Sequence, residues 1–369
     1  MSKPIVVYTD PAWAITDDGS SDVATANIER EIFQDRLTFK IGQARAGKYR
    51  KGGRELGDLV RGADAIAIYR VQITRELLEA AGPRLKVVAR QGVGFDNLNP
   101  ALLEQLGIVG FNIPDYCVDE VATHTLALCL ALERRLIVQH RQLTAGRFDI
   151  YGGGIPRRLH NCVAGMIGFG RIGRVVAARL RDFYGSVQAY DPYVEQDLMV
   201  AHGVKKVDFE TLLRTSDLIS LHCVLSDETA GIMDQSALSL MKPSAFLVNA
   251  ARGALVERRA LRAALTSGAI AGAGIDVFTP EDPNEDECYR DILRLENVVV
   301  TSHRAFLSAE AEASQRRRVA EGILTVLEHG RPPPVGHLTQ DLGVTRAQRE
   351  QRAAWAETPR ASAALAEHS

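Results

Sequence analysis

Residues 163–180, VAGMIGFGRIGRVVAARL, decide the fold because they place three glycines between a strand-like run and a helix-like run. Gly168, Gly170 and Gly173 have the spacing G-x-G-x-x-G. At such a turn the first glycine permits a tight bend, the second lets the backbone approach a pyrophosphate, and the third lets the helix pack closely on the strand. Free N–H groups at the helix start also favour phosphate charge. The stretch predicts a dinucleotide-binding turn; an ordinary strand-to-helix turn is the alternative.

Strand-like runs alternate with helical patterns on both sides of this turn. The runs are IVVY (5–8), ADAIAIY (63–69), LKVVA (85–89), GIVGFN (107–112), VAGMIG (163–168), VQAYD (187–191), DLISLH (217–222), AFLVNA (245–250), IAGAGIDVF (270–278) and NVVVTS (297–302). Short apolar runs of this kind are typical of strands buried in parallel sheets. We expect an α/β protein with two Rossmann-like or flavodoxin-like domains, each with a doubly wound parallel sheet.

The length of the chain, 369 residues, also suits two domains. Residues 118–146 keep a helical period for longer than an average helix, which predicts a helix connecting two domains. The second series of strands places a dinucleotide-binding domain at 118–303. Residues 335–369 are rich in Ala, Arg, Glu and Gln, and they predict a mobile tail or a docked helix.

The composition argues against several classes of partner. Lys and Arg (44) nearly balance Asp and Glu (46), so no global field attracts nucleic acid or an anionic membrane. No apolar run approaches the roughly 20 residues of a membrane span or forms a secretory signal. The five cysteines form no C-x-x-C pair, as in a reduced cytoplasmic protein. His124, His140 and His160 are too isolated to predict a metal site.

Asp191 indicates which dinucleotide binds. It ends the next strand, 18 residues beyond Gly173, close to the spacing of roughly 20 for an acid that binds the adenosine ribose. Its charge would repel a 2′-phosphate, and the following Pro192 and Tyr193 supply no cation. The sequence predicts NAD rather than NADP; an aspartate that only caps the next turn is the alternative.

Arg252, Glu281 and His303 each follow a predicted strand, where the carboxyl ends of parallel strands form a ligand crevice. A guanidinium binds a carboxylate through two hydrogen bonds, and histidine exchanges a proton near neutral pH. A carboxylate on the second imidazole nitrogen would orient the ring and favour its protonated form. Taken singly, each residue has an ordinary alternative: a structural histidine, a solvated arginine and an exposed acidic loop.

Several runs together resemble one family, the D-isomer-specific 2-hydroxyacid dehydrogenases. They are GMIGFGRIGRVVAARL, LVNAARGALV, GAGIDVFTPEDP, NVVVTSHRAF, ARQGVGFDNLN and GIVGFNIPDYCVDEVATHTLALCLAL. The similarity covers residues 5 to 333. The runs IYRVQITRELL and RQGVGFDN lean toward the C-terminal-binding-protein branch, whereas Phe306 stands where that branch has tryptophan, and Arg304 stands where many relatives have a small residue.

The resemblance implies roles for individual residues. Arg252, Glu281 and His303 would be the catalytic arginine, glutamate and histidine, and Asp276 would lie near the nicotinamide carboxamide. The substrate would be bound by Arg90, by the Val93 and Gly94 backbone, and by Arg252 and His303. The remaining residues of the predicted cofactor site are Arg171, Ile172, Cys223 and Ala250.

The resemblance also implies a substrate domain of residues 1–117 plus 304–334, with the cofactor domain inserted, and a homodimer. The sequence thus predicts a dehydrogenase that moves a hydride between NAD and a small 2-oxo or 2-hydroxy acid, with His303 as general acid and base. Arg70 and Arg90 either recognise a second anionic group on the substrate or pair with local acids. Two alternatives remain open: an NADH-sensing protein that binds a partner, and oxidation of another anion such as formate or phosphite.

Overall fold

A computed structural model describes residues 2–15, 21–43 and 53–339 and divides the chain into two units. Unit 1 comprises Met1–Tyr116 and Ser308–Ser369, and unit 2 comprises Cys117–Leu307. Unit 2 is therefore inserted into the chain of unit 1. The cofactor domain predicted from the sequence, 118–303, begins one residue after the start of unit 2 and ends four residues before its end.

Unit 1 has a five-stranded parallel sheet in the order β2-β1-β3-β4-β5, the order of flavodoxin-like folds. Its strands are β1 (Ile5–Tyr8), β2 (Thr38–Ile41), β3 (Ala65–Ile68), β4 (Val87–Arg90) and β5 (Val109–Phe111). Its helices are α1 (Asn27–Phe33), α2 (Arg54–Val60), α3 (Arg75–Ala81), α4 (Pro100–Gln105) and α13 (Ala309–His329), with 3-10 turns η1 (Ala12–Ala14) and η2 (Val23–Thr25). The sequence did not predict β2, an edge strand whose side chains are all at least partly exposed.

The C-terminal helix α13 belongs to unit 1 because it packs against α1 and β4. Its Arg316 donates hydrogen bonds to the buried Glu29 carboxylate at 2.7 and 3.0 Å. The same guanidinium lies 4.0 Å from the ring centroid of Trp13. A buried charge needs such partners, so this pair fixes α13 on the N-terminal part of the chain. Helices α1 and α13 cover one face of the sheet, and α2, α3 and α4 cover the other.

Unit 2 has a seven-stranded parallel sheet in the order β12-β11-β10-β9-β6-β7-β8. Its strands are β6 (Val163–Ile167), β7 (Ser186–Tyr190), β8 (Lys205–Lys206), β9 (Leu218–Leu221), β10 (Phe246–Asn249), β11 (Gly272–Ile275) and β12 (Val298–Val300). Apart from the added β12, this is the Rossmann order, which reverses between β6 and β9. The predicted doubly wound α/β class is confirmed; the two-residue β8 was not predicted.

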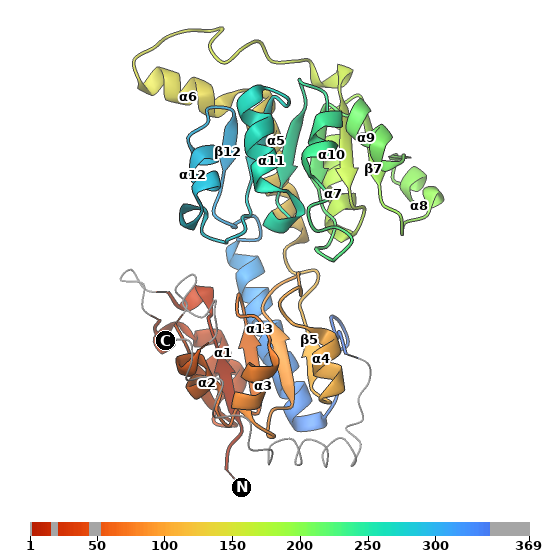
Figure 1. Ribbon diagram of the computed structural model, residues 1–369. Helices are drawn as coiled ribbons and strands as arrows, with labels where there is room; N and C mark the ends of the chain where they lie inside the picture. Colours follow the sequence, from red (N-terminus) through yellow and green to blue (C-terminus); the bar gives the residue numbers. More distant parts are fainter. Residues whose placement is uncertain (1, 16–20, 44–52, 340–369) are drawn as a thin grey trace. The chain divides into compact units, whose positions relative to one another are not determined.

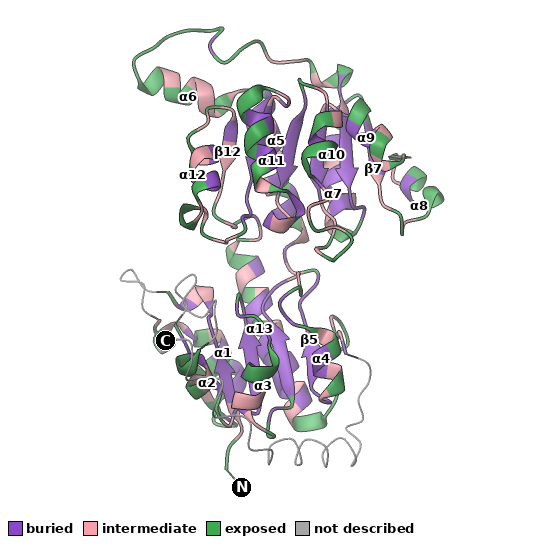
Figure 2. Ribbon diagram, in the orientation of Figure 1, coloured by how far each residue is buried: buried purple, intermediate pink, exposed green. Residues whose placement is uncertain are grey.

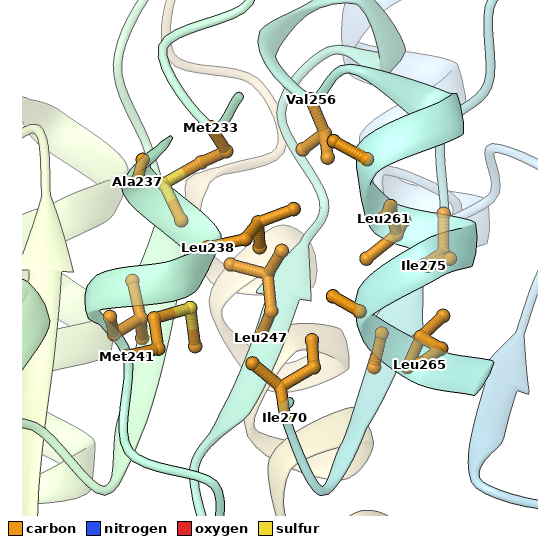
Figure 3. Packing of buried hydrophobic residues seen from close by; sticks show 14 of the residues in the cluster. Met233, Ala237, Leu238, Met241, Leu247, Val256, Leu261, Leu265, Ile270 and Ile275 are labelled. Carbon is orange, nitrogen blue, oxygen red and sulfur yellow. The ribbon is translucent and has the colours of Figure 1, made fainter. Parts of the chain in front are cut away.

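Helices cover both faces of this sheet, as Figures 1 and 2 show. They are α5 (Val118–Glu133), α6 (Leu136–Thr144), α7 (Arg171–Leu180), α8 (Gln196–Ala201), α9 (Phe209–Thr215), α10 (Gln235–Leu240), α11 (Arg258–Ser267) and α12 (Glu287–Leu293), with 3-10 turns η3 (Leu159–Asn161), η4 (Gly253–Leu255) and η5 (Pro283–Glu285). In Figure 3, Leu238, Leu247 and Leu261 from α10, β10 and α11 meet in one apolar core. Helices α5 and α7 pack on the opposite face. The sheet is buried on both sides, which holds the strand ends rigidly.

The expected single helix at 118–146 is wrong. The chain leaves the helical conformation at Arg135, whose φ of 56° is left-handed, and α5 and α6 are separate. Arg157 donates a hydrogen bond of 2.7 Å to Glu133 at the end of α5. The Arg135 and Arg157 guanidinium groups lie 4.9 and 5.5 Å from the Phe246 ring centroid. These contacts tie the break between the helices to the sheet.

The first residues of the predicted tail, 335–339, are described, and some of them contact unit 1. His337 pairs with Phe111 at the end of β5, and the hydroxyl of the buried Thr339 accepts the Gly110 N–H at 3.1 Å. Residues 340–369 lie outside the described part of the chain. Among the described residues, no helix combines the length and apolar character needed to cross a membrane.

Candidate functional site

The three glycines directly follow β6 and occupy three different environments. Gly168 has a φ of +93°, and a Cβ there would lie 2.4 Å from the backbone nitrogen of Cys223. A Cβ on Gly173 would lie 2.4 Å from the carbonyl oxygen of Gly168. A Cβ on Gly170, by contrast, would meet nothing within 4 Å. The turn is therefore bent at the first glycine, open at the second and closely packed at the third, as a pyrophosphate-binding turn requires.

The open glycine is also the N-cap of α7, which Arg171 and Ile172 begin. The first N–H groups of a helix have no partner within the helix, so they can bind phosphate oxygens. Cys223 follows β9 with its backbone against Gly168, and burial raises the pKa of its thiol to about 11. That thiol is neutral at physiological pH. Ala250 follows β10 and is partly exposed. The surroundings of the turn thus fit a dinucleotide phosphate.

Asp191 directly follows β7 and contacts the glycine turn. Its Oδ2 accepts the Phe169 N–H at 2.8 Å, and its Oδ1 accepts the Tyr193 N–H at 2.9 Å. The capping role considered from the sequence is therefore present. A carboxylate has about four acceptor sites, so these two hydrogen bonds leave capacity for ribose hydroxyls.

His303 and Glu281 are brought together by adjacent strands. His303 follows β12 and Glu281 follows β11, and parallel pairing places both after the same edge of the sheet. The His303 Nδ1 and the Glu281 Oε1 are 2.5 Å apart, and the two side chains are 23% and 34% exposed. This contact was expected from the sequence. The Nε2 side of the imidazole remains the side that can meet a substrate.

The backbone of His303 is unusual, with a φ of 52°. A non-glycine residue in this region costs on the order of 1–3 kcal/mol and persists only where its surroundings enforce it. The His303 N–H donates to the Asp276 carbonyl at 2.6 Å. The Phe306 ring lies edge-on to the imidazole, with centroids 6.2 Å apart. Neighbouring groups thus hold the histidine in place.

Arg252 follows β10, the third of these neighbouring strands. The buried Asn249 shapes its turn, because its side chain donates to the Arg252 carbonyl at 2.9 Å and accepts the Ala251 N–H at 3.1 Å. A Cβ on Gly253 would lie 2.3 Å from the carbonyl carbon of Phe278, so the loops after β10 and β11 touch. The loop of Arg252 therefore lies against the loop that leads to Glu281.

Asp276 is fully buried, and its carboxylate contacts the segment that carries His303. Oδ1 accepts the Arg304 N–H and Oδ2 accepts the Ala305 N–H, each at 3.0 Å. Its expected position near a nicotinamide carboxamide stays a prediction. In the structure it anchors a loop.

The substrate residues expected in unit 1 lie in the turn after β4. The Asn112 side chain donates to the Val93 carbonyl at 2.5 Å, and the Ile113 N–H donates to the Gly92 carbonyl at 3.1 Å. Val93 and Gly94 are partly exposed. Arg90 is nearly buried, and one of its guanidinium nitrogens donates to the Gln91 carbonyl. The turn is thus held from one side and open on the other.

A second arginine comes from the end of β3. The Arg70 and Arg90 guanidinium groups lie 5.2 and 5.3 Å from the ring centroid of Tyr69. The buried Asp10 accepts the N–H groups of Tyr69, Arg70 and Val71. Burial raises the pKa of the Asp10 carboxyl, although the hydrogen bonds from Tyr69 and Arg70 act in the opposite direction. Two guanidinium groups therefore lie close to the Tyr69 ring, just after β3.

Sequence reasoning missed the polar residues that support the site. Asp10, Asn249, Thr301 and His124 touch the loops of the predicted residues. Three of them carried a signal, because Asp10, Asn249 and Thr301 end or closely follow apolar strand runs. Nothing in the sequence linked His124 to Thr301. Among the described residues, no group of three or more His, Cys, Asp or Glu could hold a metal ion.

The fold and the turn define a dinucleotide-binding protein of Rossmann type. Residues 126–305 match the profile described as D-isomer specific 2-hydroxyacid dehydrogenase, NAD binding domain. A glyoxylate reductase from Thermococcus litoralis is 35% identical over 285 residues, which cover 74% of this chain and 83% of that protein. The chain belongs to the D-isomer-specific 2-hydroxyacid dehydrogenase family, and the predicted NAD cofactor is confirmed.

Other relatives carry related names. A D-3-phosphoglycerate dehydrogenase from Mycobacterium leprae is 36% identical over 267 residues, which cover 72% of this chain and 49% of that protein. The chain thus spans about half the length of such relatives. A crystal structure of D-lactate dehydrogenase from Aquifex aeolicus, in complex with NAD and lactic acid, has a TM-score of 0.76 at 28% identity and covers 87% of this chain and 95% of that one. The leaning toward the C-terminal-binding-protein branch stays a prediction.

Proposed function

We propose that this protein is an NAD-dependent oxidoreductase that interconverts small 2-oxo and 2-hydroxy acids. The observation that carries the proposal is the 2.5 Å contact between His303 Nδ1 and Glu281 Oε1, after adjacent strands of the NAD-binding sheet. A histidine oriented by a carboxylate is the usual arrangement of a general acid and base. Both side chains are partly exposed, so the imidazole is accessible to a ligand.

The roles of the side chains follow from this geometry. Bound NADH would supply the hydride that reaches the substrate's carbonyl carbon. His303 donates the proton from Nε2 to the carbonyl oxygen, while Glu281 holds Nδ1 and stabilises the charged ring. Arg252 binds the substrate carboxylate and stabilises negative charge that develops on the carbonyl oxygen. In the oxidative direction His303 takes the same proton back.

We assign substrate choice to the turn after β4 and to the arginine side chains near it. The Val93 and Gly94 amides, at the partly exposed turn, hold the substrate carboxylate. Arg70 and Arg90, both near the Tyr69 ring, favour a substrate with a second anionic group such as a phosphate or a further carboxylate. D-3-phosphoglycerate dehydrogenase and glyoxylate reductase among the relatives offer one test substrate of each kind.

The proposal extends to a homodimer in the cytoplasm. Large apolar side chains are exposed on α6 and the segment after it, which Figure 1 shows extending from the body of unit 2. They are Leu136, Leu143, Phe148, Ile150, Tyr151 and Ile155. A concentration of exposed apolar side chains marks an interaction surface. Sedimentation of a Phe148→Ser, Ile155→Ser variant as a monomer, against a dimeric wild type, would support it. All five cysteines are free, as expected in a reducing compartment.

The activity is tested by NADH oxidation with a panel of 2-oxo acids. The panel contains glyoxylate, hydroxypyruvate, 2-oxoglutarate and phosphonate-bearing analogues, and Arg70→Met and Arg90→Met are measured beside the wild type. We expect both variants to lose more efficiency with dianionic acids than with glyoxylate. Tight NADH binding without turnover of any acid in either direction would contradict the proposed activity and favour an NADH-sensing role.

A further inference from the structure

The buried Asp276 is the centre of a hydrogen-bond network that surrounds the His303 segment. Its side chain is 0% exposed, and its carboxylate accepts the N–H groups of Arg304 and Ala305. Its own carbonyl accepts the N–H of His303. The Thr301 hydroxyl also donates to Oδ1 at 2.5 Å. The residues on both sides of the left-handed histidine are therefore tied to one aspartate.

A second histidine completes this network from a different element. His124 lies on α5, which packs against β11 and β12. Its Nε2 is 2.9 Å from the Thr301 hydroxyl and 3.6 Å from Asp276 Oδ1. The His124 side chain is 22% exposed.

The directions of these hydrogen bonds are fixed by chemistry. A carboxylate only accepts, so the Thr301 hydroxyl uses its single proton toward Asp276. The hydroxyl oxygen can then only accept from His124, whose Nε2 must carry a proton. The chain of donors runs from His124 through Thr301 to Asp276. Removing the histidine would leave the partly buried Thr301 hydroxyl with an unmet acceptor and the Asp276 carboxylate with one neighbouring donor fewer.

We propose that His124 is a positioning residue: through Thr301 it fixes Asp276, and thereby holds the strained backbone that presents His303 to the substrate. The inference rests on the proposed function for its catalytic consequence, but the anchoring itself does not. A non-glycine residue in the left-handed region persists only where its neighbours enforce that conformation. Asp276 supplies three hydrogen bonds that do so, by accepting the backbone N–H groups of His303, Arg304 and Ala305. The effect of His124 should therefore appear in kcat rather than in binding.

The experiment compares His124→Leu, which removes the donor, with His124→Gln, whose amide can still donate toward Thr301. Thr301→Val and Thr301→Ser form the matching pair on the hydroxyl. Hydrogen–deuterium exchange of the peptide covering 301–307 reports anchoring, and kcat, KM and NADH affinity report function. We expect His124→Leu to speed exchange in this peptide and to lower kcat about tenfold, with KM and NADH affinity nearly unchanged. His124→Gln should recover most of both losses.

Coupling between the two sites makes the test specific. If His124 acts through Thr301, the variant with both His124→Leu and Thr301→Val should lose little more than either single variant. His140→Gln, on the exposed face of α6, is the control for a general histidine effect. Unchanged exchange in His124→Leu, or fully additive losses in the double variant, would overturn the inference. Altered exchange in a protein that turns over no acid would uphold the anchor and refute the proposed activity.

Discussion

The carboxyl edge of the unit 2 sheet has two ends that are built by opposite means. After β6, where the glycine turn lies, the decisive feature is the absence of side chains: any Cβ on Gly168 or Gly173 would collide with backbone, while Gly170 is open. After β10, β11 and β12, the decisive feature is side-chain hydrogen bonding, in which Asn249 and Asp276 shape the loops of Arg252 and His303.

The difference fits what each end is proposed to hold. A pyrophosphate needs several N–H groups at close range, which backbone supplies only where no side chain intervenes. Proton transfer needs one imidazole in one orientation, which requires partners on the ring and on the backbone. We therefore expect substitutions at the glycine end to act on binding, and substitutions at the histidine end to act on turnover.

The largest effect is expected at His303. His303→Ala removes the proton donor and should lower kcat/KM by about 10³-fold or more, with NADH affinity within about threefold of the wild type. Glu281→Gln keeps a hydrogen-bonding side chain but removes the charge, and we expect a loss of about 10- to 100-fold. Steady-state NADH oxidation and fluorescence titration with NADH measure the two quantities. Near wild-type turnover by His303→Ala would rule out its assigned role.

Gly170→Ala should show the reverse pattern. The added methyl meets no protein atom, and the φ of −76° suits alanine, so thermal stability should stay close to the wild type. The methyl would occupy the approach of the pyrophosphate, and we expect NADH affinity to fall about 10- to 100-fold. Gly173→Ala, whose methyl would meet the Gly168 carbonyl, should instead lower the unfolding temperature. Equal NADH affinity in Gly170→Ala and the wild type would place the phosphates elsewhere.

The same contrast explains what could be predicted of the fold. Parallel strands such as β9 and β10 are buried on both faces, so each consists of a largely apolar run that can be recognised in the sequence. Strand β2 lies at an edge with partly exposed side chains, and β8 has two residues, so neither leaves an apolar run. At the break between α5 and α6, Arg157 contacts Glu133 from 24 positions along the chain. No local pattern records such a contact.

For the candidate site, spacing predicted residues whose proposed roles rest on their own chemistry or on a missing side chain. The three glycines, Asp191 and the pair of His303 and Glu281 belong to this group. The pairing of His124 with Thr301 was not identifiable, because the two residues are 177 positions apart and meet only after folding. Asp276 was named, yet its observed contacts with the His303 segment could not be inferred from its position in GAGIDVF.

A smaller effect is expected for Asp191, whose charge should set the preference for NADH over NADPH. The wild type should use NADH with higher kcat/KM than NADPH, because the carboxylate opposes a 2′-phosphate. Asp191→Asn keeps an oxygen that can accept one N–H but removes the charge, and should raise the NADPH-to-NADH ratio about tenfold, or about 1.4 kcal/mol. Equal or better efficiency of the wild type with NADPH would refute the preference.

The smallest effect concerns His222, which lies beside the glycine turn. A Cβ added to Gly173 would be 3.5 Å from the Cβ of His222. Burial lowers the pKa of His222 to about 3, from 6.5. Above pH 6.5 the ring is neutral in folded and unfolded chains alike. As the pH falls from 6.5 toward 3, only the unfolded chain takes up this proton, so the free energy of unfolding decreases.

His222→Gln removes this proton uptake and should therefore reduce the acid sensitivity of folding. Because the residue is only half-buried, we expect a difference of about 1 kcal/mol in the stability lost between about pH 7.5 and pH 5.5, measured by urea unfolding. His140→Gln, which changes an exposed histidine, should follow the wild type. Parallel pH profiles for all three proteins would show that His222 is solvated and would contradict the lowered pKa.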